Sequence, residues 1–343
     1  KVFKKDEKIM EKNHPKVNYG KTGILLINLG TPDSTNWLDI RKYLKEFLSD
    51  RRVIEVNPLI WQIILNVFIL TFRPSKTAKA YKKIWMHKEN MSPLRHYTIM
   101  QAKKLGDKIK GENTIVDYAM RYGKPSIKDK IYSLQKKGCE NLIVLPLYPQ
   151  YAAATTATVC DEVYRCLTQM RWQPSLQIIP HYESEPLYIK ALVKSLDKKI
   201  SQLSWKPDTI VASYHGIPKK YFEKGDPYHC YCQKTTRLIK ENFKSDVPII
   251  TTFQSRFGPQ EWLTPYTDKT FEKLPQEGKK NILVICPGFS SDCVETLEEI
   301  SIQGKETFLE KGGKNFEAVS CLNDNEDHIN LLLHLTNKFL SNK

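Results

Sequence analysis

Eight short apolar runs alternate with longer amphipathic stretches along the chain. They cover residues 24–29, 115–120, 142–147, 176–179, 209–214, 249–253, 282–286 and 316–319. Runs of this length, rich in branched residues, predict strands that are buried on both faces. Because helix-length stretches separate them, the alternation indicates the α/β class, with mostly parallel sheets flanked by helices.

The predicted strands form two groups, separated by the polar segment Trp172-Gln173-Pro174-Ser175. We therefore expect two similar α/β domains, over residues 20–168 and 169–322, which a chain of 343 residues can accommodate. A last amphipathic stretch, about 326–340, predicts a helix that packs back on the first domain.

Polar motifs follow six of the predicted strands. They are Gly30-Thr31-Pro32, Arg121-Tyr122-Gly123, Tyr148-Pro149-Gln150-Tyr151, His215-Gly216, Gln254-Ser255-Arg256 and Pro287-Gly288-Phe289. Ligands of open parallel sheets bind beyond the carboxyl ends of the strands, so these motifs predict a ligand-binding cleft between the domains. The chain has neither the GxGxxG nor the GxxxxGK[ST] motif, so no nucleotide cofactor is expected.

The most reactive combination in the sequence is His215 with a later acidic segment. Glu295 and Glu299 lie four residues apart on a predicted helix, and Gln303 continues the same row. Imidazole can bind a transition metal or accept a proton near neutral pH, and a row of carboxylates can carry protons away. An exposed, solvated acidic face is the alternative.

The composition indicates which classes of molecule the protein could bind and in which cellular compartment it works. The 53 Lys and Arg residues against 38 Asp and Glu predict attraction to lipid head groups, nucleic acid or a carboxylate-bearing small molecule. No basic run is densely interleaved with aromatic residues, so nucleic acid is not an expected partner. Eight scattered cysteines favour reduced thiols and a cytoplasmic location. The start of the chain, up to Asn18, resembles neither a signal peptide nor a transit peptide.

Segment 58–70 is apolar on nearly every side and has only Gln62 and Asn66 as polar residues. It is shorter than the roughly 20 residues that a membrane-spanning helix needs. Basic residues flank it, namely Arg51, Arg52, Arg73 and Lys76. This pattern predicts a segment that lies in a membrane interface near anionic lipid, and a buried core helix is the alternative.

The chain resembles the ferrochelatase family, the enzymes that insert ferrous iron into a porphyrin, over nearly its whole length. The matching segments are residues 23–32, 92–94, 121–123, 145–151, 213–218, 225–228, 253–259 and 295–299. The resemblance implies two Rossmann-like domains of the chelatase type with the porphyrin in the cleft between them. It further implies that ferrous iron enters protoporphyrin IX to give protohaem, with the release of two protons, as the last step of haem biosynthesis.

Specific residues follow from the same resemblance. His215 and Glu295 match metal-binding and proton-handling positions, and Glu299 extends the acidic path. The positions implied to bind the porphyrin are Tyr81, Ser92, Arg121, Tyr122, Tyr148, Trp262 and Phe289. Segment 58–70 matches a hydrophobic lip that touches the membrane through Leu59, Ile60, Trp61, Ile64 and Phe68. A cytoplasmic protein with peripheral membrane contact is therefore implied.

Two departures from the family pattern bear on metals. Cys293 stands where many members have histidine, two residues before the acid, and Ala153 stands where cluster-bearing animal enzymes have cysteine. No cofactor beyond substrate Fe²⁺ is expected, and an animal-type iron–sulfur cluster is not expected. Cys230 and Cys232 could ligate a metal or a different cluster, although they lack the second half of a zinc site.

Two other functions fit the same residues. A haem- or porphyrin-binding carrier would use His215 as an axial ligand, with the carboxylates merely solvated. A cobalt or nickel chelatase would differ only in its metal. Protoporphyrin and coproporphyrin both remain as candidate substrates, and the apolar lip favours protoporphyrin. The sequence does not indicate an oligomeric state.

Overall fold

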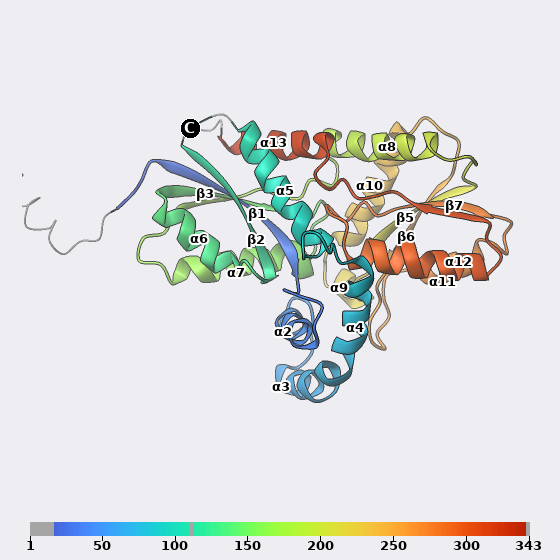
Figure 1. The fold of residues 1–343 in the computed structure, drawn as a ribbon, viewed down its shortest axis with the longest axis horizontal. Helices are drawn as coiled ribbons and strands as arrows, with labels where there is room; N and C mark the ends of the chain where they lie inside the picture. The colour runs from blue at the N-terminus through green and yellow to red at the C-terminus, as the bar shows by residue number, and fades with distance from the viewer. Residues whose placement is uncertain (1–16, 110, 112, 341–343) are drawn as a thin grey trace, which may run out of the picture.

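Two four-stranded parallel sheets form the body of the protein (Figure 1), in a computed structural model that describes residues 17–109, 111 and 113–340. The first has the order β2-β1-β3-β4, and the second the order β6-β5-β7-β8. Their strands are β1 (Lys21–Thr31), β2 (Thr114–Gly123), β3 (Cys139–Pro146), β4 (Ser175–Ile178), β5 (Thr209–His215), β6 (Ile249–Gln254), β7 (Asn281–Ile285) and β8 (Asn315–Ala318). All six strand pairs are parallel, which confirms the predicted fold class.

Helices cover both sheets and extend beyond them. They are α2 (Trp37–Leu48), α3 (Pro58–Ile63), α4 (Leu70–Ile84), α5 (Pro93–Lys108), α6 (Ile127–Lys136), α7 (Thr158–Thr168), α8 (Pro186–Ser201), α9 (Lys219–Glu223), α10 (Tyr228–Asn242), α11 (Thr267–Lys273), α12 (Lys305–Glu310) and α13 (Glu326–Leu340). Three further segments of the described chain are π-helices, namely η1 (Ile64–Ile69), η2 (Ala153–Ala157) and η3 (Glu295–Gly304). The prediction made for the start of the chain, up to Asn18, falls almost entirely outside the described residues.

Both faces of the central strands are buried, as their apolar runs predict. Ile24 and Leu26 of β1 belong to one hydrophobic core, whereas Leu25 and Ile27 belong to another on the opposite face. The first of these cores also contains Ile210 of β5, so it is shared by the two sheets. Alternate side chains of a strand point to opposite faces, and this period-two division is what places helices on both sides.

The structure corrects the expected division of strands. The expected boundary puts segment 176–179 in the second group, but β4 pairs with β3 in parallel, with Asn141 opposite Ser175. The boundary between the two sheets therefore lies after Ile178 and not near residue 168. Local composition could not show this, because the polar segment before β4 is a turn within the first sheet. Helix α13 contacts α5 and β3 as expected, and it also packs against α8.

Helices α2, α3 and α4, together with η1, project from the body below the first sheet (Figure 1). They have a small core of their own, which includes Ile40, Leu44, Leu65 and Tyr81. Asn57 caps the start of α3 by accepting hydrogen bonds from the backbone amides of Leu59 and Ile60. This projecting unit carries the apolar segment that the sequence singles out.

Helix α13 packs into the hydrophobic core that the two sheets share. Leu332 is completely buried in that core, so replacing it with alanine should lower the free energy of unfolding by about 2–5 kcal/mol through lost burial and a residual cavity. Denaturant unfolding measures this change. Leu309→Ala, at a side chain that is 40% exposed, is the matched control and should stay within about 0.5 kcal/mol of wild type. Equal effects of the two substitutions would contradict the packing of α13.

Candidate active site

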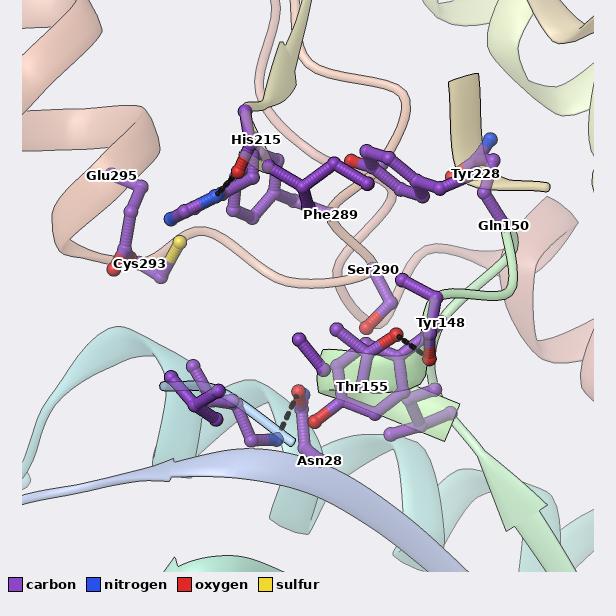
Figure 2. A pocket seen from close by; sticks show the side chains of 18 of the residues that line it. Asn28, Tyr148, Gln150, Thr155, His215, Tyr228, Phe289, Ser290, Cys293 and Glu295 are labelled. Carbon is purple, nitrogen blue, oxygen red and sulfur yellow. Dashed lines mark hydrogen bonds between the residues drawn. The ribbon is translucent and has the colours of Figure 1, made fainter. Parts of the chain in front are cut away.

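A cavity lies between the carboxyl ends of the two sheets. It contains about 980 Å³ of space including its open mouth. Asn28, Leu147 and Tyr148 line it from the first sheet, and His215 and Phe289 from the second. Figure 2 shows Asn28 and Tyr148 on the wall that faces His215 and Phe289. The cleft predicted from the polar motifs at the strand ends is therefore present.

His215 is the last residue of β5, and one hydrogen bond fixes its reactive atom. Its Nδ1 lies 2.7 Å from the carbonyl oxygen of Gly216. Since a carbonyl only accepts hydrogen bonds, Nδ1 carries the proton in the neutral ring, and Nε2 has the free lone pair. Figure 2 shows the edge of this imidazole directed toward Cys293 and Glu295.

Glycine is required after His215 because the chain passes very close to β6. A Cβ atom on Gly216 would lie 2.9 Å from the carbonyl oxygen of Gln254 and 3.2 Å from the Trp262 ring. The backbone amide of Gly216 donates to that same carbonyl at 2.7 Å. The His-Gly motif therefore holds the imidazole at the point where the strands of the second sheet end.

Glu295 and Cys293 lie beside the imidazole at the start of η3. A carboxylate in the first turn of a helix interacts favourably with the exposed amide groups there. Cys293 is buried, and burial together with the charge of Glu295 raises the pKa of its thiol well above the usual value. Cys293 is therefore a neutral thiol at neutral pH, and it offers sulfur where a histidine would offer nitrogen.

Glu299 lies behind Glu295 and is held by the end of β6. Its two carboxylate oxygens accept hydrogen bonds from the backbone amide of Ser255 at 2.8 Å and from the Ser255 hydroxyl at 2.5 Å. Burial raises the pKa of Glu299 above its usual value of 4.5, and the charge of Glu295 adds to this, whereas the Ser255 hydrogen bonds and His215 act against it. Ser255 has a φ of +64°, a strained conformation for a serine that aims both donors at one carboxylate.

The expected row of side chains along this helix is wrong at Gln303. Residues 295–304 form a π-helix, whose backbone hydrogen bonds join residues five apart, so side chains five positions apart come within reach of each other. The amide of Gln303 donates to both oxygens of Glu298, at 2.9 and 2.8 Å. Only Glu295 and Glu299 of the predicted row remain as the acidic pair near His215.

Of the seven residues predicted to bind the porphyrin, three line the cavity and four do not. Tyr148, Trp262 and Phe289 line the cavity, whereas Tyr81, Ser92, Arg121 and Tyr122 are not among its lining residues. The Ser92 hydroxyl instead caps α5 by accepting from the backbone amide of Arg95, and Tyr81 is buried in the core of the projecting unit.

Arg121 and Tyr122 belong to a polar network behind the cavity. The Arg121 guanidinium donates to Asp50 at 2.5 Å and to the backbone carbonyl of Thr158 at 2.9 Å. The Tyr122 hydroxyl donates to the same Asp50 oxygen at 2.9 Å, as does the Thr158 hydroxyl at 2.7 Å. Asp50 therefore neutralises Arg121 and fixes the chain between α2 and α3 to the first sheet.

That chain continues as a strap, residues 50–55, which crosses to the second half of the protein. The Tyr221 hydroxyl of α9 donates to the carbonyl of Val53 at 3.1 Å and accepts from the amide of Glu55 at 3.1 Å. Val53 and Tyr221 both line the cavity. No local sequence pattern signals this strap, because its contacts join residues more than 160 positions apart.

Other lining residues are also missed by reasoning from the sequence. They include Asn28, Gln150, Thr155, Tyr228 and Ser290, which are labelled around the cavity in Figure 2. Gln150 is visible within the Tyr-Pro-Gln-Tyr motif, but its role is not. Its amide donates to Thr235 at 3.0 Å, so it links the cavity wall to α10.

The apolar segment presents an exposed face, which excludes a fully buried core helix. Leu59, Ile60 and Phe68 are 80%, 56% and 58% exposed, whereas Ile64 is only half-buried. Trp61 is expected on the outer face, but it is buried and donates from Nε1 to the Leu48 carbonyl at 2.6 Å. It therefore anchors the segment to α2.

The continuous helical stretch Pro58–Ile84 is, by length and composition, the one candidate among the described residues that could cross a membrane, and 17% of its most apolar window is buried. Leu65, Leu70 and Ala78 on its inner side pack into the core of the projecting unit. A helix with one packed face and one exposed face is suited to lying on a surface.

The Cys230 and Cys232 pair does not form a shared ligand site. Cys232 is fully buried, whereas Cys230 is exposed, because residues two apart on α10 point in different directions. Within residues 17–109, 111 and 113–340, no group of three or more His, Cys, Asp and Glu side chains is placed to hold a metal ion. Among these residues, the His215 imidazole and the Glu295 carboxylate line the cavity without a third such side chain that would complete a metal site.

Comparison with known proteins agrees with this geometry. The family model described as Ferrochelatase matches residues 21–340. The ferrochelatase of Allorhizobium ampelinum is 53% identical over 329 residues, which cover 95% of this chain and 96% of that protein. The ferrochelatase of Francisella tularensis is 50% identical over 320 residues, which cover 92% and 95%.

Solved structures agree with the fold. SirB from Bacillus subtilis with Fe³⁺ matches with a TM-score of 0.54 and 13% identity, over 94% of this chain and 97% of that one. The sirohydrochlorin chelatase SirB from Bacillus subtilis subspecies spizizenii, in complex with cobalt, matches with a TM-score of 0.57 and 10% identity over the same shares. At such low identity these two structures show the fold alone. The chain belongs to the ferrochelatase family, the lyases that insert ferrous iron into protoporphyrin IX to form protohaem.

Proposed function

We propose that the cavity between the two sheets is where this chain inserts ferrous iron, and that His215 and Glu295 carry out the insertion. The observation that supports this most strongly is the orientation of His215. Its Nδ1 is engaged with the Gly216 carbonyl, so the Nε2 lone pair is directed to the side of the cavity that holds Cys293 and Glu295. A base and a carboxylate thus lie together in a site that is otherwise largely apolar.

The reaction needs a proton acceptor more than any other group. Fe²⁺ exchanges its water ligands for four ring nitrogens, and the two pyrrole N–H groups lose their protons. His215 Nε2 accepts each proton in turn, and Glu295 and then Glu299 pass it outward. This order follows from geometry, because Glu299 lies behind Glu295 and is bound to Ser255.

The apolar walls suit a flat aromatic ring. Trp262, whose ring lies beside Gly216, and Phe289 line the cavity. Figure 2 shows Phe289 near His215 and Tyr148 on the facing wall. The Tyr148 hydroxyl is buried without a hydrogen-bond partner among the described residues. Such rings hold a macrocycle by stacking and by excluding water, and binding energy from its periphery can bend it so that the nitrogen lone pairs face the metal.

The proton-transfer assignment predicts a selective loss of turnover. His215→Ala and Glu295→Ala should each lower kcat by about 10²–10⁴-fold, because each removes a group that handles protons in the transition state. The assay is anaerobic incubation with Fe²⁺ and free protoporphyrin, followed through many turnovers. His334→Ala, at a half-exposed ion pair with Glu185, is the control and should retain wild-type turnover.

The same assay tests the rival functions. A carrier would give a stoichiometric binding spectrum and no multiple turnovers, and near-normal turnover in either site variant would remove the assignment. Repeating it with coproporphyrin and with Co²⁺ or Ni²⁺ in place of Fe²⁺ compares the alternative substrates and metals under the same conditions.

The raised pKa of Glu299 predicts how the stability of the protein changes with pH. Its pKa is raised in the folded protein, mainly by burial, so the folded state binds its proton more tightly than the unfolded chain does. Wild type should therefore lose stability relative to Glu299→Gln as the pH rises from about 4.5 through the raised pKa, by about 1.4 kcal/mol for each pH unit that separates the folded and unfolded pKa values. Denaturant unfolding at a series of pH values measures this difference. A stability difference independent of pH, or one of opposite sign, contradicts the burial of this carboxyl.

We further propose that the exposed face of segment 58–70 contacts a membrane and that the protein works in the cytoplasm as a peripheral membrane protein. The exposed apolar side chains of this segment are flanked in the sequence by the exposed cations Arg51 and Lys76, which favour anionic lipid. Two other flanking cations have partners, since Arg52 pairs with Asp161 and Arg73 stacks on Phe257. The remaining pair and the apolar face support interfacial binding.

Replacing Leu59, Ile63 and Phe68 together with serine should reduce binding to vesicles at least about tenfold, because each exposed side chain loses apolar area that the membrane would bury. Sedimentation with vesicles of neutral and of anionic lipid measures the binding. Phe222→Ser with Leu309→Ser, at exposed apolar residues far from this segment in the sequence, is the control. Equal binding of vesicles by wild type and the triple variant would contradict the proposed membrane contact of segment 58–70.

A further inference from the structure

Helix η3 is a π-helix over its whole length of ten residues. Most π-helices are single turns inserted into α-helices, often at functional sites, because the wide turn is less stable than the α-helix. A longer π-helix therefore needs specific contacts that prefer it to the α-helical alternative. Its first five residues include both carboxylates of the proposed proton path.

Two side-chain contacts in η3 join residues five positions apart. The Ser301 hydroxyl donates to the Thr296 carbonyl at 2.9 Å. The Gln303 amide donates to both carboxylate oxygens of Glu298, at 2.9 and 2.8 Å. In an α-helix, residues five apart are separated by about 140° around the axis, so these pairs could not meet. Both contacts exist only in the π register.

Glu298 is also tied to the neighbouring helix α4. Its carboxylate accepts a charge-assisted hydrogen bond from Lys83 Nζ at 2.9 Å. The Glu298 side chain is 7% exposed and that of Lys83 is 47% exposed, so the lysine reaches in from the surface to a buried carboxylate. A buried carboxylate needs several donors to be tolerated, and Lys83 and Gln303 supply them only while η3 keeps its present turn.

The register of η3 decides where the other two acids point. In the observed register Glu295 faces the cavity, and Glu299 reaches both donors of Ser255. Conversion to an α-helix would rotate every residue after Glu295 relative to it. Glu299 would then leave Ser255, and the path from His215 would be broken.

We propose that Glu298 is a positioning residue that, with Gln303 and Lys83, locks η3 in its π register and so keeps Glu295 and Glu299 aligned with His215. Glu298 itself touches neither iron nor porphyrin. The inference rests on the proposed proton path. The stabilisation of the π register by these three residues, called the lock below, is a property of the protein alone. It can therefore be measured without iron or porphyrin.

The test compares Glu298→Leu, Gln303→Leu and Lys83→Met with two matched controls. Lys82→Met changes the adjacent exposed lysine of α4, and Glu306→Gln changes an exposed acid just beyond η3. Each of the three test variants should lower kcat by about 10–100-fold, as expected for a small misplacement of catalytic groups, with porphyrin binding unchanged. Glu298→Gln should recover part of the activity, because its carbonyl oxygen can still accept one of the two donors.

The pH profile separates positioning from simple destabilisation. Without its Ser255 hydrogen bonds, Glu299 should protonate more readily, so the acid limb of the kcat profile should move to higher pH in the three variants. His215, Glu295 and Cys286 are ionisable groups that interact with Glu299, and none of the three is altered in these variants. A lower thermal midpoint with unchanged kcat per folded molecule and an unchanged acid limb would overturn the proposal.

Amide hydrogen exchange gives the second readout, on protein without iron or porphyrin. Exchange within residues 295–304 should be faster in the three variants than in wild type and should be unchanged in both controls. Wild-type exchange rates in the variants would overturn the lock even if activity fell. If wild type itself failed to insert iron, the proposed function would fail, and the exchange comparison would still decide on the lock.

Discussion

The hydrogen bond between His215 Nδ1 and the carbonyl of Gly216 determines what the cavity can do, because it leaves the lone pair on Nε2 free. Its position depends on the second sheet. His215 ends β5, which lies between β6 and β7, and the turn after it passes so close to Gln254 that only glycine fits. The parallel sheet therefore supplies a proton acceptor at a defined point and in a defined tautomer.

The three acids of η3 have three different surroundings. Glu295 faces the cavity, Glu298 is bound by Lys83 and Gln303, and Glu299 is bound by Ser255. Burial raises the pKa of Glu299, so this carboxyl reduces stability at neutral pH. Retaining such a group is understandable if it conducts protons, since a carboxyl with a raised pKa exchanges protons more readily near neutral pH than a solvated one.

Features that depend on local pattern are predictable from the sequence. Period-two burial and strand length indicate the parallel sheets, and the polar motifs at strand ends indicate the cleft with His215 in it. Features that depend on distant contacts or rare geometry are not predictable. Gln303 is misplaced because nothing in the local sequence distinguishes a π-helix from an α-helix, and Trp61 is misplaced because its partner is a carbonyl on another helix. Likewise, Arg121 is identified as part of a network only once Asp50 is known to lie beside it.

The central claim is that a porphyrin lies between the two sheets with its ring nitrogens against His215. A crystal structure with an N-methylated protoporphyrin, in which a methyl group blocks one ring nitrogen against metal insertion, tests this most directly. We predict that the ring fills the cavity between Tyr148 and Phe289, with His215 Nε2 and the Glu295 carboxylate nearest to its four nitrogens. A macrocycle bound outside this cavity, or one whose nitrogens lie far from His215, would contradict the account.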